Sequence, residues 1–333
     1  MASDDGSLTT YLRLNLIGES PAFQDCLRLI RRMAACDATV LVQGETGTGK
    51  ELAARAIHYL GRRSGASFIP VNCGALPESL VESELFGHAR GAFTDAREAR
   101  AGVVAQAEGG TLFLDEVEAL GLHAQAALLR FLQEREYRPI GGALVRGANV
   151  RVIASSNVDL HVIVANGMFR QDLLFRLNVL PLTLPPLRER GDDVATLAEV
   201  FLRRFSHQYG QPQKTLDAES ISFLASHAWP GNVRELENLI HRQVLLSDSP
   251  VIRLVPDRDN RSGAESTFRE AKAQAIAEFE RRYVKALLAR THGNISLAAR
   301  LSGKERSRLC KMVKKYGLER ERSVRGQPIA KAG

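Results

Sequence analysis

The 333-residue sequence has few cysteines and no long apolar run. Its four cysteines, Cys26, Cys36, Cys73 and Cys310, include no CxxC pair, which excludes a disulfide scaffold and favours reduced thiols. No apolar stretch reaches the roughly 18–20 residues that a transmembrane helix needs. The N-terminus has neither a basic segment nor an apolar segment behind it, so we expect no secretory signal. These absences predict a cytoplasmic protein without a membrane partner.

Two common kinds of catalytic site lack their signatures. The eight histidines show no HxxxH or HExxH spacing, so we expect no metal held by protein side chains alone. A Gly-x-Ser-x-Gly nucleophile motif is also missing. The composition, 44% hydrophobic and 25% charged, is that of a globular protein and excludes a disordered or collagenous chain. At roughly 150 residues per domain, the length favours about two domains.

The excess of basic residues lies at the C-terminus. Residues 290–333 contain 12 Lys or Arg against 3 Asp or Glu, so they carry +9, while residues 1–289 carry −2. A basic module on a nearly neutral body is typical of nucleic-acid-binding proteins. Composition alone leaves a solvated charged tail as the alternative.

Strand-like and helical patterns alternate in the first half of the chain. Apolar runs predict strands at 38–43, 68–73, 111–114, 150–154 and 179–184. This alternation predicts an α/β domain with a parallel sheet. After Pro185-Pro186 the strand pattern stops, and helices are expected at 193–205, 218–227 and 232–246.

These patterns divide the chain into four parts. Residues 1–14 are a short N-terminal extension. An α/β part to about residue 186 and a helical subdomain over 187–254 make up a domain at 15–254. Residues 255–267, rich in Pro, Asp, Asn, Ser and Gly, predict a linker to a small all-α domain over 268–333.

A glycine-rich turn follows the first predicted strand. It reads Gly44-Glu45-Thr46-Gly47-Thr48-Gly49-Lys50-Glu51. Such a turn lets backbone N–H groups converge on phosphate oxygens, and Lys50 supplies a charge for the β- and γ-phosphates. Glu51 stands where a usual P-loop has the Ser or Thr that binds Mg²⁺, so this motif alone leaves open a glycine-rich turn without a ligand.

A predicted buried strand that ends in two carboxylates favours a nucleotide site. Asp115 can hold Mg²⁺ directly or through water, and Glu116 can polarise a water for attack on the γ-phosphate. Together with Lys50, these residues predict a nucleoside triphosphate site. Arg170 and Arg176 could serve the same phosphate, although their spacing equally allows two surface charges.

The C-terminal basic residues lie on two helical patterns joined at Gly303. In the first, over 294–302, Ile295, Ala298 and Leu301 face one way. The second, over 304–316, has an apolar stripe formed by Leu309, Met312, Val313 and Tyr316. A helix, a glycine turn and a basic helix are typical of the helix-turn-helix, whose second helix enters the major groove. A small bundle with a solvated basic face is the alternative.

The helix-turn-helix interpretation assigns the basic helix to double-stranded DNA. Its N-terminal side chains would reach base edges and its later lysines would contact phosphates. The expected DNA-binding residues are Lys304, Arg306, Ser307, Arg308, Lys311, Lys314 and Lys315.

Longer phrases resemble those of one family. Residues 84–96 contain Gly91-Ala92-Phe93-Thr94-Asp95-Ala96, and the phrases LPPLRER (184–190) and WPGNVREL (229–236) follow. In this order they resemble the bacterial enhancer-binding proteins, AAA+ ATPases that activate sigma-54 RNA polymerase. The resemblance covers about residues 15–254. Over about 268–318 the chain resembles the Fis-type DNA-binding domain.

The resemblance implies roles for several residues. The loop Gly91–Ala96 would contact the sigma factor, whereas without the resemblance we would favour a Phe93 tucked into the core. A P-loop that ends in Gly-Lys-Glu is usual in this family. Arg170 and Arg176 would reach the ATP of a neighbouring subunit.

Three further roles come from the resemblance alone. Asn72 would restrain the catalytic glutamate, Asn157 would be the first nucleotide sensor, and Arg234 the second. Ser155-Ser156 replaces the commoner Ala-Thr before Asn157. The ATP-binding residues would therefore be the turn 44–51 together with Asp115, Asn157 and Arg234, with Mg²⁺ on Asp115.

The implied function is transcriptional activation. The protein would bind enhancer DNA, form a ring hexamer or similar oligomer with dimer contacts through its C-terminal domain, and use ATP hydrolysis to open the closed complex of the sigma-54 RNA polymerase holoenzyme. A DNA-binding regulator without a productive ATPase is one alternative. An AAA+ unfoldase or helicase is another, but those lack the phenylalanine loop.

The position of the core predicts a mode of regulation. Only about fifteen residues precede it, too few to fold as a sensor domain. If the chain is whole, we expect no N-terminal regulatory domain and control through an inhibitory partner or protein abundance. A fragment of a longer regulator is the alternative.

Overall fold

The computed structural model describes residues 16–93, 96–254, 280, 283–284, 287–288, 291, 294–303 and 306–315, without the side chains at 308, 310 and 314. The chain forms two compact units, 1–255 and 256–333, which are described separately. Among the helices in these ranges, none is long and apolar enough to cross a bilayer.

The first unit is built on a five-stranded sheet. In spatial order its strands are β2 (Phe68–Asn72), β5 (Thr111–Asp115), β8 (Arg151–Ser156), β1 (Val40–Gln43) and β9 (Leu180–Thr183). Every neighbouring pair is parallel. Each strand lies within two residues of its predicted range, and the expected α/β class is confirmed.

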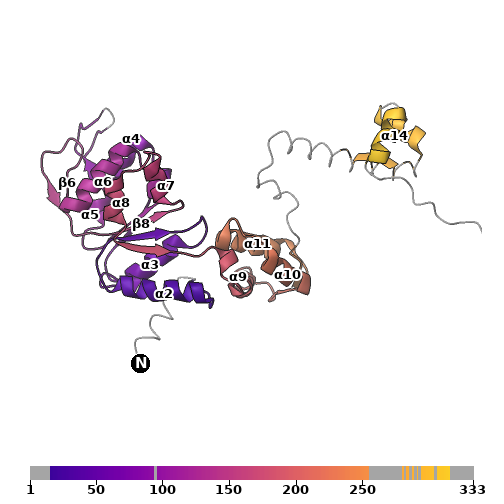
Figure 1. Ribbon diagram of the computed structural model, residues 1–333, viewed down its shortest axis with the longest axis horizontal. Helices are drawn as coiled ribbons and strands as arrows, with labels where there is room; N and C mark the ends of the chain where they lie inside the picture. Colours follow the sequence, from indigo (N-terminus) through magenta and orange to yellow (C-terminus); the bar gives the residue numbers. More distant parts are fainter. Residues whose placement is uncertain are drawn as a thin grey trace, which may run out of the picture. The chain divides into compact units, whose positions relative to one another are not determined.

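Helices cover both faces of this sheet (Figure 1). One face, with Val40 and Val42 of β1, packs against α2 (Pro21–Ala34) and α3 (Lys50–Tyr59). The other, with Leu41, packs against five helices. These are α4 (Glu78–Phe86), α5 (Val103–Gln106), α6 (Leu122–Glu134), α7 (Leu160–Ala165) and α8 (Gln171–Leu177). Because successive strand side chains point to opposite faces, continuous apolar strands require helices on both.

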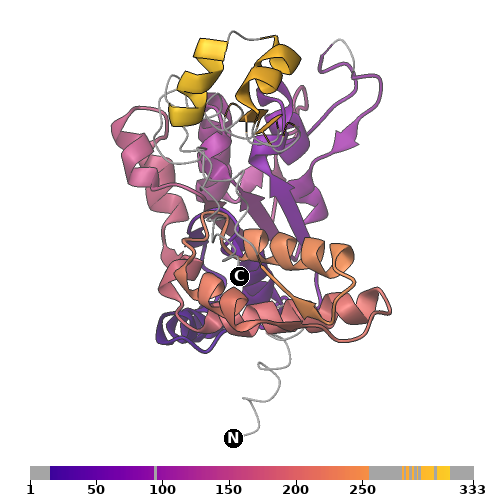
Figure 2. The same ribbon diagram turned by 90° about the vertical axis from the view of Figure 1, so that its right-hand side faces the viewer.

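A helical subdomain follows the sheet. It contains the 3₁₀ turn η3 (Leu187–Glu189) and the helices α9 (Asp193–Gln208), α10 (Ala218–Ser226) and α11 (Asn232–Leu246), packed around a buried Trp229. Figures 1 and 2 show these helices grouped beside the α/β part, away from the two helix-covered faces of the sheet.

Strands do not stop at Pro185-Pro186, contrary to expectation. Within the helical subdomain, β10 (Thr215–Leu216) pairs in parallel with β11 (Val251–Ile252). Each strand has only two residues, which is too short for an alternating pattern to stand out in the sequence.

Two small hairpins extend the α/β part and were not expected from the sequence. In one, β3 (Gly87–His88) pairs with β4 (Arg100–Ala101); in the other, β6 (Glu136–Tyr137) pairs with β7 (Arg146–Gly147). Reciprocal backbone bonds join them, because Ala89 N donates to Ile140 O and Ile140 N donates to Gly87 O, both at 2.9 Å. The two hairpins therefore form one projection, which Figures 1 and 2 place far from α9–α11.

The second unit contains the expected pair of helices, α13 (Ile295–Ser302) and α14 (Arg306–Lys315). Asn294 caps α13 by accepting a hydrogen bond from Leu297 N at 3.1 Å, and Gly303 ends it with a left-handed φ of 64°. Among the described residues of this unit, the buried apolar ones are Val284, Leu287, Ala298, Ala299, Leu309, Met312 and Val313.

One expected core residue of this unit is wrong. Leu301 does not share the buried face of Ala298, since its side chain is 57% exposed. The buried face of α13 is centred on Ala298 and Ala299. Leu301 lies about 200° around the helix from Ala299, because each residue turns the helix by about 100°.

Candidate nucleotide site

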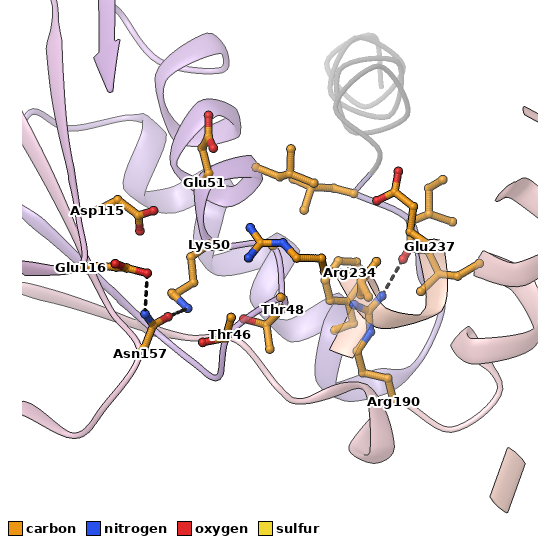
Figure 3. A pocket seen from close by; sticks show the side chains of 18 residues that line it. Thr46, Thr48, Lys50, Glu51, Asp115, Glu116, Asn157, Arg190, Arg234 and Glu237 are labelled. Carbon is orange, nitrogen blue, oxygen red and sulfur yellow. Dashed lines mark hydrogen bonds between the residues drawn. The ribbon is translucent and has the colours of Figure 1, made fainter. Parts of the chain in front are cut away.

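The carboxyl ends of three neighbouring strands meet at one edge of the sheet. Because β8 lies between β1 and β5, Asn157 after β8 stands between Lys50 and Asp115. A pocket opens here, as ligand sites do at the strand ends of α/β sheets (Figure 3). Its polar lining includes Thr46, Thr48, Lys50, Glu51, Asp115, Glu116, Asn157, Arg190, Arg234 and Glu237, and its apolar lining Leu16, Ile17, Phe23, Leu52, Leu197 and Val233.

Lys50 is almost fully buried, at 7% exposed, and its ammonium group is held from three sides. Nζ donates to Gly44 O at 2.8 Å, to Glu45 O at 3.0 Å and to Asn157 Oδ1 at 2.5 Å. Burial lowers the pKa of Lys50, and the charge of Asp115 is the largest effect that opposes this shift. A confined cation of this kind is suited to phosphate oxygens.

The glycine-rich turn has the backbone that a phosphate cradle needs. Gly47 and Gly49 have φ values of 81° and 98°, in the left-handed region that glycine adopts at low cost. A Cβ at Gly47 would lie 2.2 Å from Gly231 O, so no larger residue fits there. The turn leads directly into α3, whose N-terminus supplies unpaired N–H groups. The turn therefore fits the phosphates of a nucleotide.

The two predicted carboxylates are held by residues of β8 and the position after it. Ser155 Oγ donates to Asp115 Oδ1, and Asn157 Nδ2 donates to Glu116 Oε1 at 3.0 Å. Glu116 itself has a left-handed φ of 58°, uncommon outside glycine. The replacement at Ser155 thus gives Asp115 a hydrogen bond that an alanine could not make.

Asn72 lies close to this pair. It is in register with Asp115 across β2 and β5, but its Oδ1 accepts from Ala75 N at 3.0 Å, which caps the turn after β2. A Cβ at Gly74 would lie 2.6 Å from Glu116 Oε2 and 3.3 Å from Asn72 Oδ1. The two side chains therefore share one side of Gly74, while the hydrogen bond to Glu116 comes from Asn157.

The turn before α11 attaches the helical subdomain to the glycine-rich turn. Val233 N donates to Gly47 O at 3.1 Å, and Asn232 Nδ2 donates to Thr46 O at 3.0 Å. Arg234 follows directly, and its guanidinium group points into the pocket towards Lys50 (Figure 3). The helical subdomain thereby supplies a second cation to the site.

Glu45 makes a different contact from the one expected. Among the described residues, Gly44 and Glu45 do not line the pocket. The Glu45 carboxylate pairs with Arg188 at 2.6 and 2.8 Å and accepts from Asn232 Nδ2 at 3.1 Å. The hydrogen bond from Arg188 is the main reason that the pKa of Glu45 falls to about 2.

The two candidate phosphate-sensing arginines lie elsewhere. Neither Arg170 nor Arg176 lines the described pocket. Arg170 precedes α8 and pairs with Asp172 through two hydrogen bonds of 3.0 and 2.7 Å, and Arg176 is exposed in the last turn of α8. The structure does not bring them to the nucleotide site of their own chain.

The expected sigma-contact loop sits on the two-hairpin projection. Phe93 is 39% exposed and its ring meets the His88 ring edge-on, with centroids 5.0 Å apart. Gly91 N donates to Ala96 O at 2.8 Å, which closes the loop over Ala92, and Ala96 is buried. Phe93 is thus not a core residue. Thr94 and Asp95 lie outside the described residues.

The expected DNA-binding residues can be followed in part. Arg306, Ser307 and Lys311 are exposed on α14. Lys315 is exposed too and lies 3.8 Å from Glu280. Lys304 and the side chains of Arg308 and Lys314 lie outside the description.

Comparison with family models covers almost the whole chain. Residues 16–183 match the sigma-54 interaction domain, 188–273 the AAA+ ATPase lid domain and 275–316 the Fis family of bacterial regulatory proteins. The chain belongs to the sigma-54-dependent transcriptional regulators. The lid match includes residues 255–267, which composition predicts as a linker and which are outside the described residues.

Two known proteins of this family align over more than two thirds of their own length. The DNA-binding transcriptional regulator NtrC of Bradyrhizobium is 41% identical, over 96% of this chain and 73% of NtrC. The regulatory protein AtoC of Escherichia coli is 42% identical, over 92% of this chain and 68% of AtoC. A crystal structure of NtrX from Brucella abortus in complex with ATP is 33% identical, with a TM-score of 0.72 over 90% of this chain and 69% of NtrX.

These similarities confirm several expectations. This sigma-54-dependent regulator has an AAA+ ATPase domain with a lid and a Fis-type DNA-binding domain, and it binds and hydrolyses ATP.

The structure adds residues that sequence reasoning missed in this regulator. Arg190, only 3% exposed, donates to Asp193 at 3.1 Å and to Ile17 O at 2.6 Å, while Asp193 also accepts from Glu19 N and from Ser20 N. This buried pair fixes the apolar side of the pocket to the lid. In the sequence, Arg190 stands out only as part of the LPPLRER phrase. That phrase does not indicate partners 173 residues away in the chain.

Proposed function

We propose that copies of this chain form a ring in which Mg²⁺-dependent ATP hydrolysis opens the sigma-54 promoter complex. The observation that carries the proposal is that Arg170 and Arg176 do not line the nucleotide pocket of their own chain, whose arginines are Arg190 and Arg234. Lys50, Asp115 and Glu116 line one pocket, whereas Arg170 and Arg176 are exposed away from it. An arginine that stabilises charge on the γ-phosphate accelerates phosphoryl transfer by roughly 10³–10⁵, so a neighbouring copy is the expected donor.

Each pocket residue has a role in this reaction. Lys50 leaves its backbone acceptors and pairs with the β- and γ-phosphates, and Arg234 binds the phosphates from the lid. Glu116 accepts a proton as water attacks the γ-phosphorus and the bond to the bridging oxygen breaks, which yields ADP and phosphate. The Asp115 carboxylate is the hard oxygen ligand that would hold Mg²⁺, which when bound would neutralise phosphate charge.

The two-hairpin projection is the expected contact with the sigma factor. Its loop, Gly91–Ala96, exposes Phe93, and an aromatic ring left partly in water is suited to a protein partner. Thr94 and Asp95 complete this contact. Asn157, which touches both Lys50 and Glu116, is placed to couple the state of the nucleotide to the sheet that carries the hairpins.

The C-terminal unit is the proposed enhancer-binding module. Arg306, Ser307 and Arg308 start α14 and would meet base edges, while Lys304, Lys311, Lys314 and Lys315 would meet phosphates. We also propose that the chain forms dimers through this unit and acts in the cytoplasm. Its activity would be controlled by a separate inhibitory protein.

Transcription in vitro from a sigma-54 promoter tests this function. Purified protein, sigma-54 holoenzyme and supercoiled template are combined with ATP or with a non-hydrolysable analogue. We expect open complexes only with the protein and ATP. Open complexes that form equally well with the analogue, or an active ATPase that never yields them, would contradict the proposal.

A further inference from the structure

A third carboxylate stands behind the two that line the pocket. Glu118 lies in the 3₁₀ turn η2 (Val117–Ala119), directly after Glu116. Its Oε1 accepts a hydrogen bond from the backbone N of Asn157 at 2.9 Å. Its Oε2 is buried and has no hydrogen-bond partner among the described residues, and the side chain is not part of the pocket lining found there.

The contact falls one residue beyond the end of β8, whose register with β1 continues to Ser156. The register of β5 with β8 ends at Leu114 and Ala154, three positions before Asn157. Neither ladder includes Asn157, so strand pairing does not supply an acceptor for its backbone N–H. Buried N–H groups need an acceptor, and for Asn157 the acceptor is the Glu118 carboxylate.

The Asn157 side chain, held in this way, forms hydrogen bonds to both Lys50 and Glu116. Asn157 Oδ1 accepts from Lys50 Nζ at 2.5 Å, and Asn157 Nδ2 donates to Glu116 Oε1 at 3.0 Å. Both bonds require one orientation of the amide plane. That orientation depends on the backbone from which the side chain starts.

We propose that Glu118 is a positioning residue for ATP hydrolysis, whose carboxylate fixes the Asn157 backbone so that the asparagine side chain bridges Lys50 and Glu116. Loss of the acceptor frees Glu116 from its orienting amide and slows the chemical step. ATP binding changes less, because Glu118 does not line the pocket and Lys50 keeps its charge there. The proposal rests on the ATPase activity of the chain.

Two variants of nearly equal size separate the hydrogen bond from the charge. Glu118→Met keeps the side-chain volume but has no oxygen acceptor, whereas Glu118→Gln keeps the acceptor and loses the charge. Glu108 provides a matched control at the other end of β8, because its carboxylate accepts from Asn149 N at 3.1 Å.

The first measurement is backbone hydrogen exchange in the full-length protein without nucleotide. We expect Glu118→Met to speed exchange at Asn157 by roughly tenfold, the effect of one lost hydrogen bond to a charged acceptor. Glu118→Gln should change it by less than about threefold. Glu108→Ala should speed exchange at Asn149 and leave Asn157 as it is. Unchanged exchange at Asn157 in Glu118→Met would overturn the proposal.

The second measurement is ATP turnover. We expect kcat to fall about tenfold in Glu118→Met with KM for ATP within about threefold, and most of the loss to be rescued in Glu118→Gln. In an Asn157→Ala background, Glu118→Met should lower kcat no further, because Glu118 acts through Asn157. Equal losses in both Glu118 variants, additive losses with Asn157→Ala, or a shifted Mg²⁺ requirement would each overturn the proposal. A folding failure of Glu118→Met, detected by its Tm, would leave the test to Glu118→Gln, whose loss of more than threefold would contradict it.

Discussion

Glu45 of the glycine-rich turn and Arg188 of the lid form a two-point ion pair, with distances of 2.6 and 2.8 Å, over 143 residues of sequence. Asn232, also of the lid, donates to the same carboxylate. The loop that is expected to bind phosphate is thus attached to the lid by a charge pair at its rim.

The ion pair between Glu45 and Arg188 predicts a pH-dependent attachment of the lid. The folded-state pKa of Glu45 is about 2, below its unfolded value, so its contribution to stability is present above about pH 4.3 and disappears as pH falls towards 2. Arg188→Ala should lower Tm slightly at pH 7, and the difference should vanish over that window. Thermal unfolding between pH 7 and 2 measures it.

The control for this experiment is Arg130→Ala, which removes an ion pair with Glu134 inside α6. Both residues of that pair lie in α6, so the pair does not attach the lid to the glycine-rich turn. Nucleotide affinity should therefore fall in Arg188→Ala and stay unchanged in Arg130→Ala. Equal affinities in the two variants would count against a role for the attachment in nucleotide binding.

Substitutions of Lys50 and Glu116 should affect ATP binding and ATP hydrolysis differently. Lys50→Ala should lose ATP binding, because it removes a buried charge from the phosphate site. Glu116→Gln should bind ATP with near-parental affinity and hydrolyse it roughly 10²–10⁴ times more slowly, the usual contribution of general base catalysis. Fluorescent-nucleotide titration and phosphate release measure the two effects. Parental turnover by Glu116→Gln would show that another group activates the water.

Mixed assemblies should reveal arginines that act in trans. We expect ATPase activity to rise steeply with protein concentration. Arg170→Ala and Lys50→Ala proteins, each inactive alone, should regain part of their turnover when mixed, because one supplies an intact pocket and the other an intact arginine. Activity independent of concentration, without complementation, would indicate an enzyme complete in one chain.

Substitutions in the loop of the two-hairpin projection should abolish transcription activation without abolishing ATP hydrolysis. Phe93→Ala and Thr94→Ala should abolish activation at a sigma-54 promoter and leave ATP turnover within about threefold. The physical reason is that the described residues of the loop do not line the nucleotide pocket. Parallel loss of both activities would mean that the loop supports the ATPase itself.

DNA binding should depend strongly on salt. About five phosphate contacts from the basic helix give a log–log slope near −4.5, or roughly 500-fold weaker binding between 50 and 200 mM salt. Removal of residues 268–333 should abolish enhancer binding and leave ATPase activity in place. Filter binding at several salt concentrations measures the slope, and a truncated protein that still binds the enhancer would refute the assignment.

The sequence predicts well those parts of the fold that depend on long patterns. All five strands of the main sheet and the three lid helices follow from apolar runs and helical periodicity. The hairpins and the β10–β11 pair have two residues per strand, which carry no periodicity. Leu301 was misplaced because an eight-residue helix can turn either of two apolar edges towards its partner.

The candidate site could be predicted only as a set of motifs. Lys50, Asp115 and Glu116 were identified because each motif is contiguous in the sequence. The contacts that hold them are not contiguous: Ser155 reaches Asp115 from another strand, and Glu118 reaches Asn157 through its backbone. Side-chain partners of this kind follow from strand order, which one sequence does not specify.

The buried pair of Arg190 and Asp193 has a thermodynamic consequence. Asp193 begins the long lid helix and also accepts from Glu19 and Ser20, so the segment beside Ile17 on the apolar side of the pocket is bonded to the lid. A nucleotide that fills the pocket must then favour one lid orientation. By reciprocity, anything that favours the same orientation, including a neighbouring copy, must tighten nucleotide binding by the same factor. In the proposed ring, assembly and nucleotide affinity would therefore be linked through one buried ion pair.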